Sequence, residues 1–332
     1  MALEIKNAIL HIVGRQEGDS HFSREELDID SEICYEFISK HVKRLLNNPA
    51  AKEACFSADS AVYADIRLFQ QGDIFFKELS TRISRRLADI VQANPDIPPA
   101  DILVTSFENR KSQYLAILKL NYSECFTHRI RTDEGGSDNQ IVKHTTVLPF
   151  GSGRVEEACL IPYDPMVLRI LEKSYEAGGE QVNYFSQLFL QCDTSLSKKE
   201  AAEIIHQVVD EINLKYYDND VEMAAQLKYT LIEEAEEAGT VCLENVAKKV
   251  FQENEPVKNE FIAMAKDAGL PYDVDLGEAF VKQQFKTQKF KADNGIEISC
   301  PSELFKDPET IQIITNGDGT ISVTIKNLRK AQ

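Results

Sequence analysis

Four cations lie close together in residues 67–94, which hold the densest cationic cluster in the first half of the chain. They are Lys77, Arg82, Arg85 and Arg86. A guanidinium group presents several N–H donors in a planar fork, which suits phosphate oxygens. Every arginine except Arg329 lies at or before Arg169, so the first half is the better place for phosphate contacts. The four residues are therefore candidates for contact with a nucleic acid.

The same residues have a second interpretation. Glu78 lies four residues before Arg82, and Arg85 lies four residues before Asp89. Opposite charges at this spacing stabilise an exposed helix by a few tenths of a kcal/mol. The cluster is then a solvated, salt-bridged helix face that binds nothing. Both interpretations stay open at this point.

A second basic stretch, residues 280–291, contains no acidic residue. Its cations are Lys282, Lys286, Lys289 and Lys291, and they alternate with Phe280, Phe285 and Phe290. Aromatic rings among cations can stack on bases while the cations hold phosphates. The alternative is that the phenylalanines belong to a hydrophobic core and the lysines face water.

The sequence shows no pattern of catalytic or metal-binding residues. The six histidines form no H-E-x-x-H motif and lie at no ligand spacing from a cysteine or carboxylate. The seven cysteines are scattered without a C-x-x-C pair, which indicates reduced thiols in a cytosolic protein. We therefore predict no catalytic residue, no metal and no cofactor, although a set assembled only in space would escape this test.

An amphipathic helix is predicted to carry the first cluster. Apolar residues recur along one face of it, at Phe76, Leu79, Ile83, Leu87 and Ile90. We expect Asp73 to cap its start and Asn94-Pro95 to end it. Another helix is predicted over residues 31–46, with Lys40, Lys43 and Arg44 on its exposed side.

Strand patterns surround these helices. We predict strands at 3–13, 102–107, 113–120, 124–130, 141–148 and 155–161. Strands and helices that are segregated along the chain indicate an α+β fold with an antiparallel sheet. We expect an N-terminal α+β domain over 1–175, a helical domain over 180–290, and a C-terminal β segment over 291–332 that docks on one of them. The helical domain contains the capping box Ser197-Lys198-Lys199-Glu200.

The net charge of −17 limits the kind of partner. Such a chain is repelled by DNA at long range, so any DNA contact must be a local patch. A basic protein partner suits the overall charge better. The sequence has no long apolar run, so we expect neither a signal peptide nor a membrane span.

The chain resembles the 37-kDa bacterial nucleoid-associated proteins over nearly its whole length. The resemblance is densest over residues 56–120, and it extends to the opening MALEIKNAILH and the late GIEISCPSELF. The residues that carry it are Phe56, Ser57, Arg67, Leu68, Gln71, Gly72, Arg86 and Leu87. These residues form a fold signature and not a catalytic one.

The resemblance implies a non-enzymatic protein of the cytoplasm and nucleoid. Its implied partners are DNA, bound weakly and without sequence preference, and basic DNA-processing proteins such as topoisomerases. One alternative is an acidic adaptor that never touches DNA. A weaker alternative is a hydrolase or nuclease. The sequence leaves oligomerisation open.

Overall fold

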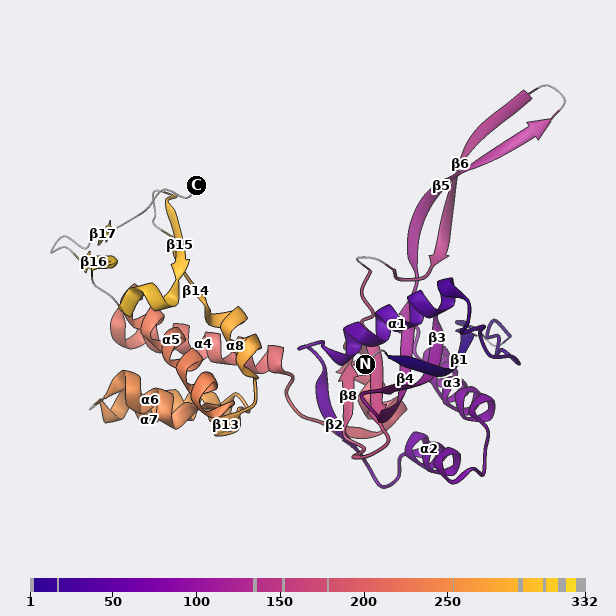
Figure 1. Ribbon diagram of the computed structural model, residues 1–332, viewed down its shortest axis with the longest axis horizontal. Helices are drawn as coiled ribbons and strands as arrows, with labels where there is room; N and C mark the ends of the chain where they lie inside the picture. The colour runs from indigo at the N-terminus through magenta and orange to yellow at the C-terminus, as the bar shows by residue number, and fades with distance from the viewer. Residues whose placement is uncertain are drawn as a thin grey trace. The chain divides into compact units, whose positions relative to one another are not determined.

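The computed structural model describes residues 3–16, 18–133, 136–150, 153–177, 179–252, 254–291, 295–306, 309–315 and 321–326. The chain divides into two compact units, Met1–Ser195 and Leu196–Gln332. The first unit is built on an antiparallel sheet, and the second is mainly helical (Figure 1). The predicted α+β class is confirmed.

Seven strands of the first unit form one sheet in the order β1-β3-β4-β7-β8-β2-β11, and each neighbouring pair is antiparallel. The strands are β1 (Glu4–Val13), β2 (Lys52–Phe56), β3 (Ala100–Asn109), β4 (Ser112–Asn121), β7 (Glu157–Pro162), β8 (Leu168–Leu171) and β11 (Cys192–Thr194). The long strands were predicted. Strands β2, β8 and β11 were not predicted, because segments of three to five residues are too short to show an alternating pattern.

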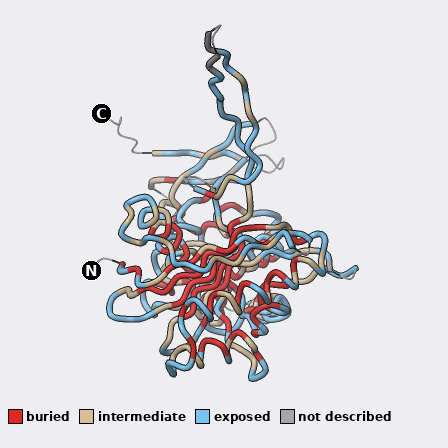
Figure 2. Tube along the Cα trace, turned by 90° about the vertical axis from the view of Figure 1, so that its right-hand side faces the viewer, coloured by how far each residue is buried: buried red, intermediate tan, exposed pale blue. Residues whose placement is uncertain are grey.

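Helices cover both faces of this sheet. The residues Ile102 and Val104 of β3 share a core with α2 (Ala61–Gln71), α3 (Phe76–Ala93) and η1 (Phe185–Leu190). The residues between and beyond them, Leu103 and Phe107, share a second core with α1 (Glu32–Leu46). A strand that is buried on both faces carries a continuous apolar run, as ILV in β3 does. Figure 2 shows how the buried residues gather along the strands.

An ion pair is buried completely on the α3 side of the sheet. Lys119 of β4 and Glu157 of β7 are partners in the strand register, and their Nζ and Oε2 atoms are 2.8 Å apart. Both side chains are 0% exposed. Burial lowers the pKa of Lys119, and the charge of Glu157 opposes that change.

Three polar side chains complete the surroundings of Glu157. Asn121 Nδ2 donates to Oε2 over 2.9 Å, the Tyr175 hydroxyl donates to Oε2 over 3.2 Å, and the Tyr184 hydroxyl donates to Oε1. Tyr175 belongs to the small hairpin of β9 (Tyr175–Ala177) and β10 (Glu180–Val182), and Tyr184 precedes η1. The ion pair therefore ties residues 175–190 to the sheet.

The apolar stripe of α3 is confirmed, with Leu79, Ile83 and Leu87 all 0% exposed. The predicted start is wrong. The helix begins at Phe76 with Phe75 at the N-cap position, and Asp73 lies before it. The reason is Gly72, which adopts a left-handed φ of 83° and ends α2, so that the next residues form a link between the two helices.

The second unit packs its helices around a core of its own. They are α4 (Lys198–Tyr217), α5 (Val221–Ala238), α6 (Leu243–Phe251), α7 (Glu255–Asp267) and α8 (Glu278–Phe285). The capping box of Ser197 and Glu200 is confirmed. Two-residue strands β12 (Val241–Cys242) and β13 (Asp273–Val274) pair between these helices. None of the helices within the described ranges is long and apolar enough to span a membrane.

The C-terminal part of the described chain contains two further hairpins and a short helix. The elements are β14 (Thr287–Lys291), β15 (Glu297–Pro301), η2 (Ser302–Lys306), β16 (Ile311–Thr315) and β17 (Ile321–Ile325). Ser302 bonds to the backbone carbonyls of Phe285 and Lys286, which anchors η2 to the end of α8.

The two units meet between Ser195 and Leu196, whereas the sequence suggested a division at residues 175–180. Residues 180–195 belong to the first unit because β11 pairs with β2 and because Tyr184 bonds to Glu157. The division into domains at 1–175, 180–290 and 291–332 stays a prediction.

His11 is a second buried polar group of the first unit. Its Nδ1 accepts a bond from the Ser23 backbone N–H, so Nε2 carries the proton and faces Ser80 Oγ of α3 at 3.2 Å. Burial lowers the pKa of His11 to about 4. The side chain is thus neutral in the folded protein near neutral pH.

Substituting Lys119→Met should lower the free energy of unfolding by about 3–5 kcal/mol, because it leaves a buried carboxylate without its cation. Adding Glu157→Gln should recover part of this loss, since no unpaired charge then remains and the amide oxygen still accepts from one of the two tyrosines. Urea denaturation followed by circular dichroism measures both. A double variant that is less stable than Lys119→Met would contradict this account.

His11 should also make stability depend on pH. Its folded pKa lies below the unfolded value, so its contribution is complete above pH 6.5 and is lost as the pH falls towards 4. The loss should reach roughly 2–3 kcal/mol. His11→Gln should flatten the measured profile of unfolding free energy between these pH values. An unchanged profile would show that His11 is not the group that titrates.

Candidate nucleic-acid interface

The α3 arginines hold a buried carboxylate. Asp65 of α2 is 3% exposed, and each of its oxygens accepts a bond of 2.9 Å, Oδ1 from Arg82 and Oδ2 from Arg86. Arg82 also donates to Glu78 over 2.6 Å, which is the pair expected from the sequence. The bonds to Asp65 and Glu78 raise the pKa of Arg82. The two arginines therefore fasten α3 to α2.

The other two cations of the cluster lie differently. The Arg85 guanidinium sits over the ring of Phe22, 5.2 Å from its centre, which is cation–π geometry. Lys77 is exposed on the first turn of α3. Of the four predicted residues, only Arg82 and Arg86 converge on one point, and that point is Asp65.

The second basic stretch divides into core and surface. Phe285 is buried and stacks on His206 with ring centres 4.4 Å apart, and Phe280 packs partly against the same core. Lys282 bonds to Glu236 at 2.8 Å and to Glu278 at 2.7 Å, and these bonds raise its pKa. Phe285 is therefore not available to stack on a base.

The remaining lysines of this stretch face water. Lys286 directly follows α8, whereas Lys289 and Lys291 lie on β14. All three lysines are exposed. Lys289 lies 3.9 Å from Glu297 of β15. Lys286 and Lys291 form no ion pair with any residue that the structure describes.

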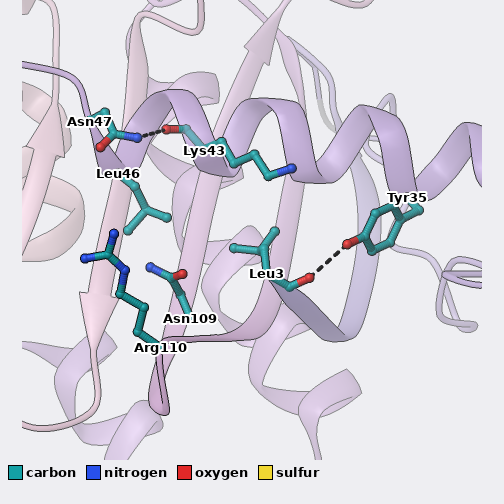
Figure 3. Close-up of a pocket in the computed structure, with 7 residues that line it drawn as sticks. All are labelled: Leu3, Tyr35, Lys43, Leu46, Asn47, Asn109 and Arg110. Carbon is teal, nitrogen blue, oxygen red and sulfur yellow. Dashed lines mark hydrogen bonds between the residues drawn. The ribbon is translucent and has the colours of Figure 1, made fainter. Parts of the chain in front are cut away.

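A third basic site was not predicted from the sequence. The turn between β3 and β4, the residue before β1 and helix α1 with its C-cap line an open cavity of about 450 Å³ in the first unit (Figure 3). Its described lining consists of Leu3, Tyr35, Lys43, Leu46, Asn47, Asn109 and Arg110. This lining includes two cations and two amides, and no carboxylate.

Neither cation of the cavity is neutralised by a residue that the structure describes. Lys43 and Arg110 are exposed, and among the described residues neither forms an ion pair. The neighbouring polar groups bond to the backbone. The Tyr35 hydroxyl donates to the Leu3 carbonyl over 2.8 Å, and Asn47 donates to the Lys43 carbonyl over 2.9 Å (Figure 3). The cavity thus presents two uncompensated positive charges from a fixed frame.

The backbone at Arg110 is unusual. Arg110 and Lys111 form the two-residue loop between paired Asn109 and Ser112, and both adopt positive φ, 52° and 71°. Such a loop favours Asn-Gly, because long side chains are strained in this conformation. Backbone strain that the surrounding structure maintains is often found at binding sites. The cationic pair in the turn is visible in the sequence. That Arg110 lines the same cavity as Lys43 is not visible there, because it depends on how α1 covers the sheet.

No group of three or more potential metal ligands occurs within the described part of the chain. The cavity residues offer hydrogen-bond donors and positive charge, which suit an anion. Phosphate is the anion that Lys and Arg side chains bind in nucleic acids.

Comparison with known proteins identifies the family. The family model of the nucleoid-associated protein YejK matches residues 9–331. The chain belongs to this family. The match confirms the resemblance drawn from residues 56–120, together with the predicted nucleoid location.

Two curated relatives are nucleoid-associated proteins of Vibrio vulnificus, from strains YJ016 and CMCP6. Each is 24% identical to this chain over 217 residues, which is 64% of the chain and 62% of the relative. The matched region thus covers less than two thirds of either relative. Family membership places this chain among bacterial nucleoid-associated proteins, but it assigns no role to a particular residue.

The geometry of Asp65 generates a test of stability. Asp65→Asn should lower the free energy of unfolding by about 1–3 kcal/mol, because two charge-assisted bonds between α2 and α3 are weakened. Asp89→Asn is the matched control, since Asp89 is an exposed acid on α3, and it should change stability by less than about 0.5 kcal/mol. Denaturation curves of the two variants and the wild type measure this difference. Equal effects would mean that the arginines do not join the helices.

Proposed function

We propose that this chain is a non-enzymatic nucleoid-associated protein that contacts DNA phosphates locally, weakly and without base preference. The observation that carries this proposal is the cavity lined by Lys43 and Arg110, two exposed cations that have no counter-charge among the described residues. Membership of the nucleoid-associated family supports DNA as the source of the phosphates.

The proposed contact is weak for two reasons. The chain carries a net charge of −17, so DNA is repelled at long range. The patch also offers few cations, and each phosphate contact contributes a slope near −0.9 to log K against log salt. A slope of roughly −2 to −4 is therefore expected for the purified protein.

The residues first selected from the sequence keep a secondary place in this proposal. Arg82, Arg86 and Lys282 are compensated by acids, so their attraction for phosphate is reduced. Lys77, Arg85, Lys286, Lys289 and Lys291 are exposed and add to the positive surface. Contact of any of them with DNA stays a prediction.

A second candidate function is recruitment by a basic protein. The internal compensation of Arg82, Arg86 and Lys282 favours it, because it removes cations from the surface of an already acidic chain. Basic DNA-processing proteins such as topoisomerases are partners of suitable charge. In that case the chain is an adaptor that reaches the nucleoid without touching DNA.

Binding of the full chain to duplex DNA at low salt tests the proposal. Lys43→Gln/Arg110→Gln should weaken binding at least about tenfold and reduce the salt slope by about 2, because two phosphate contacts are lost. The matched control is Lys199→Gln/Lys266→Gln, which removes the same charge from exposed positions on α4 and α7. The control should weaken binding far less.

The two functions give different results in this experiment. If the wild type does not bind DNA at low salt, but binds once a basic DNA-processing protein is added, the adaptor function is correct. Equal losses in the two double variants would show that only total charge matters. Tight binding with a slope of about −8 or steeper would contradict both functions, because it requires an extended cationic surface.

A further inference from the structure

One hairpin of the first unit is covered by no other element within the described ranges. The strands β5 (Ser123–Asp133) and β6 (Gly136–Val147) pair only with each other and extend away from the body of the unit (Figure 1). An isolated two-stranded hairpin is at best marginally stable in water, because neither of its faces is buried. We call this hairpin the arm.

The register of the arm separates its side chains into two faces. Residues that are directly opposite in an antiparallel pair project to the same side, and successive residues alternate. His128 pairs with Ile141, Phe126 with Lys143 and Ile130 with Asn139, so these three rows share one face. The other face carries Arg129 paired with Gln140, and Arg131 paired with Asp138.

The first of these faces exposes large apolar side chains. Phe126 is 71% exposed, Ile130 is 58% exposed and Ile141 is 84% exposed. Each of the three rows holds one apolar and one polar residue. The apolar residue lies on β5 in the outer rows and on β6 in the central row, so the three form a zigzag that is symmetric about the row of His128 and Ile141.

We propose that this face of the arm binds the same face of the arm of a second copy of the chain. The two-fold axis of this dimer lies between the two faces and runs parallel to the row of His128 and Ile141. The row that contains Phe126 in one copy then faces the row that contains Ile130 in the other copy. Ile141 then meets Ile141, and His128 meets His128. Lys143 meets Asn139, so apolar residues contact apolar residues and polar residues contact polar ones. The pattern is thus complementary to itself, as an isologous interface requires.

The charges on the arm favour a protein surface over DNA for this face. Lys143 is the one ionised side chain in the three rows of this face. Its Nζ atom lies 2.7 Å from Oε2 of Glu124, so its charge is already paired. Both arginines of the arm, Arg129 and Arg131, belong to the opposite face. An apolar face without available cations gains little from phosphates. This interaction is separate from the cavity of Lys43 and Arg110 and goes beyond the proposed function.

The size of the face predicts the strength of the dimer. The three rows span five residues of β5, which at about 3.4 Å each give a face ~17 Å long. With a width of ~10 Å this face buries roughly 340 Å² over the two copies. This area is below the range of stable complexes. We therefore expect a dimer that forms at tens of micromolar and dissociates on dilution.

Sedimentation velocity of the full chain over a range of concentrations tests the proposal. The wild type should show a concentration-dependent dimer. Phe126→Ser/Ile141→Ser should raise the dissociation constant at least about tenfold, because it removes the apolar contacts. Val142→Ser is the control, since Val142 is an apolar neighbour of Ile141 on the opposite face, and it should leave the constant within about twofold.

A crosslinking experiment tests the position of the axis. In a background where the exposed Cys55 and Cys125 are replaced by serine, His128→Cys should form an intermolecular disulfide under mild oxidation. Arg129→Cys, one residue away on the opposite face, should form much less. Preferential crosslinking through the Arg129 position would overturn the proposal.

The remaining outcomes are equally decisive. A wild type that stays monomeric up to the highest measured concentration would overturn the proposal, and so would a dimer that the double serine variant does not weaken. A loss of DNA binding in that variant without any change in association would show that the arm binds nucleic acid instead. The proposal is supported if wild type and Val142→Ser dimerise with similar dissociation constants and Phe126→Ser/Ile141→Ser dimerises at least about tenfold more weakly.

Discussion

The buried ion pair of Lys119 and Glu157 constrains the first unit more than any other interaction described above. A charge without water needs a partner and further hydrogen bonds, or its burial is strongly unfavourable. Lys119 and Asn121 come from β4, whereas Tyr175 and Tyr184 come from a segment that follows the main strands. The segment of residues 175–190 must therefore lie against the sheet, and the first unit extends to Ser195.

The pairing of opposite charges also occurs at the surface, where it determines which cations remain available to bind a phosphate. Asp65 forms ion pairs with Arg82 and Arg86, and Glu236 forms one with Lys282. Several cations that are prominent in the sequence are therefore paired with acids of the same chain. Such pairs form wherever the fold brings an acid near, and an acidic chain offers many acids. Lys43 and Arg110 stay available because the described lining of their cavity contains no acid.

Sequence patterns predicted what depends on local periodicity. The stripe of Leu79, Ile83 and Leu87 and the capping box at Ser197 follow from residues within one helix, and both are confirmed. The pairing of Lys119 with Glu157 joins residues 38 positions apart through strand register, which no local pattern encodes. The cavity has the same origin, since Lys43 and Arg110 line one cavity only when α1 covers the sheet. The zigzag of the arm also becomes visible only once its register is known.

The two proposals for the first unit reinforce each other physically. A patch of two cations binds phosphate weakly, and an arm of three apolar residues dimerises weakly. When two copies associate, the second patch meets the same DNA at a high effective concentration, so the pair binds more tightly than either copy alone. Association on DNA then becomes steep in protein concentration, although each contact is readily reversed. A strongly acidic chain can in this way accumulate on the nucleoid where it is abundant and leave it on dilution, without an extended basic surface.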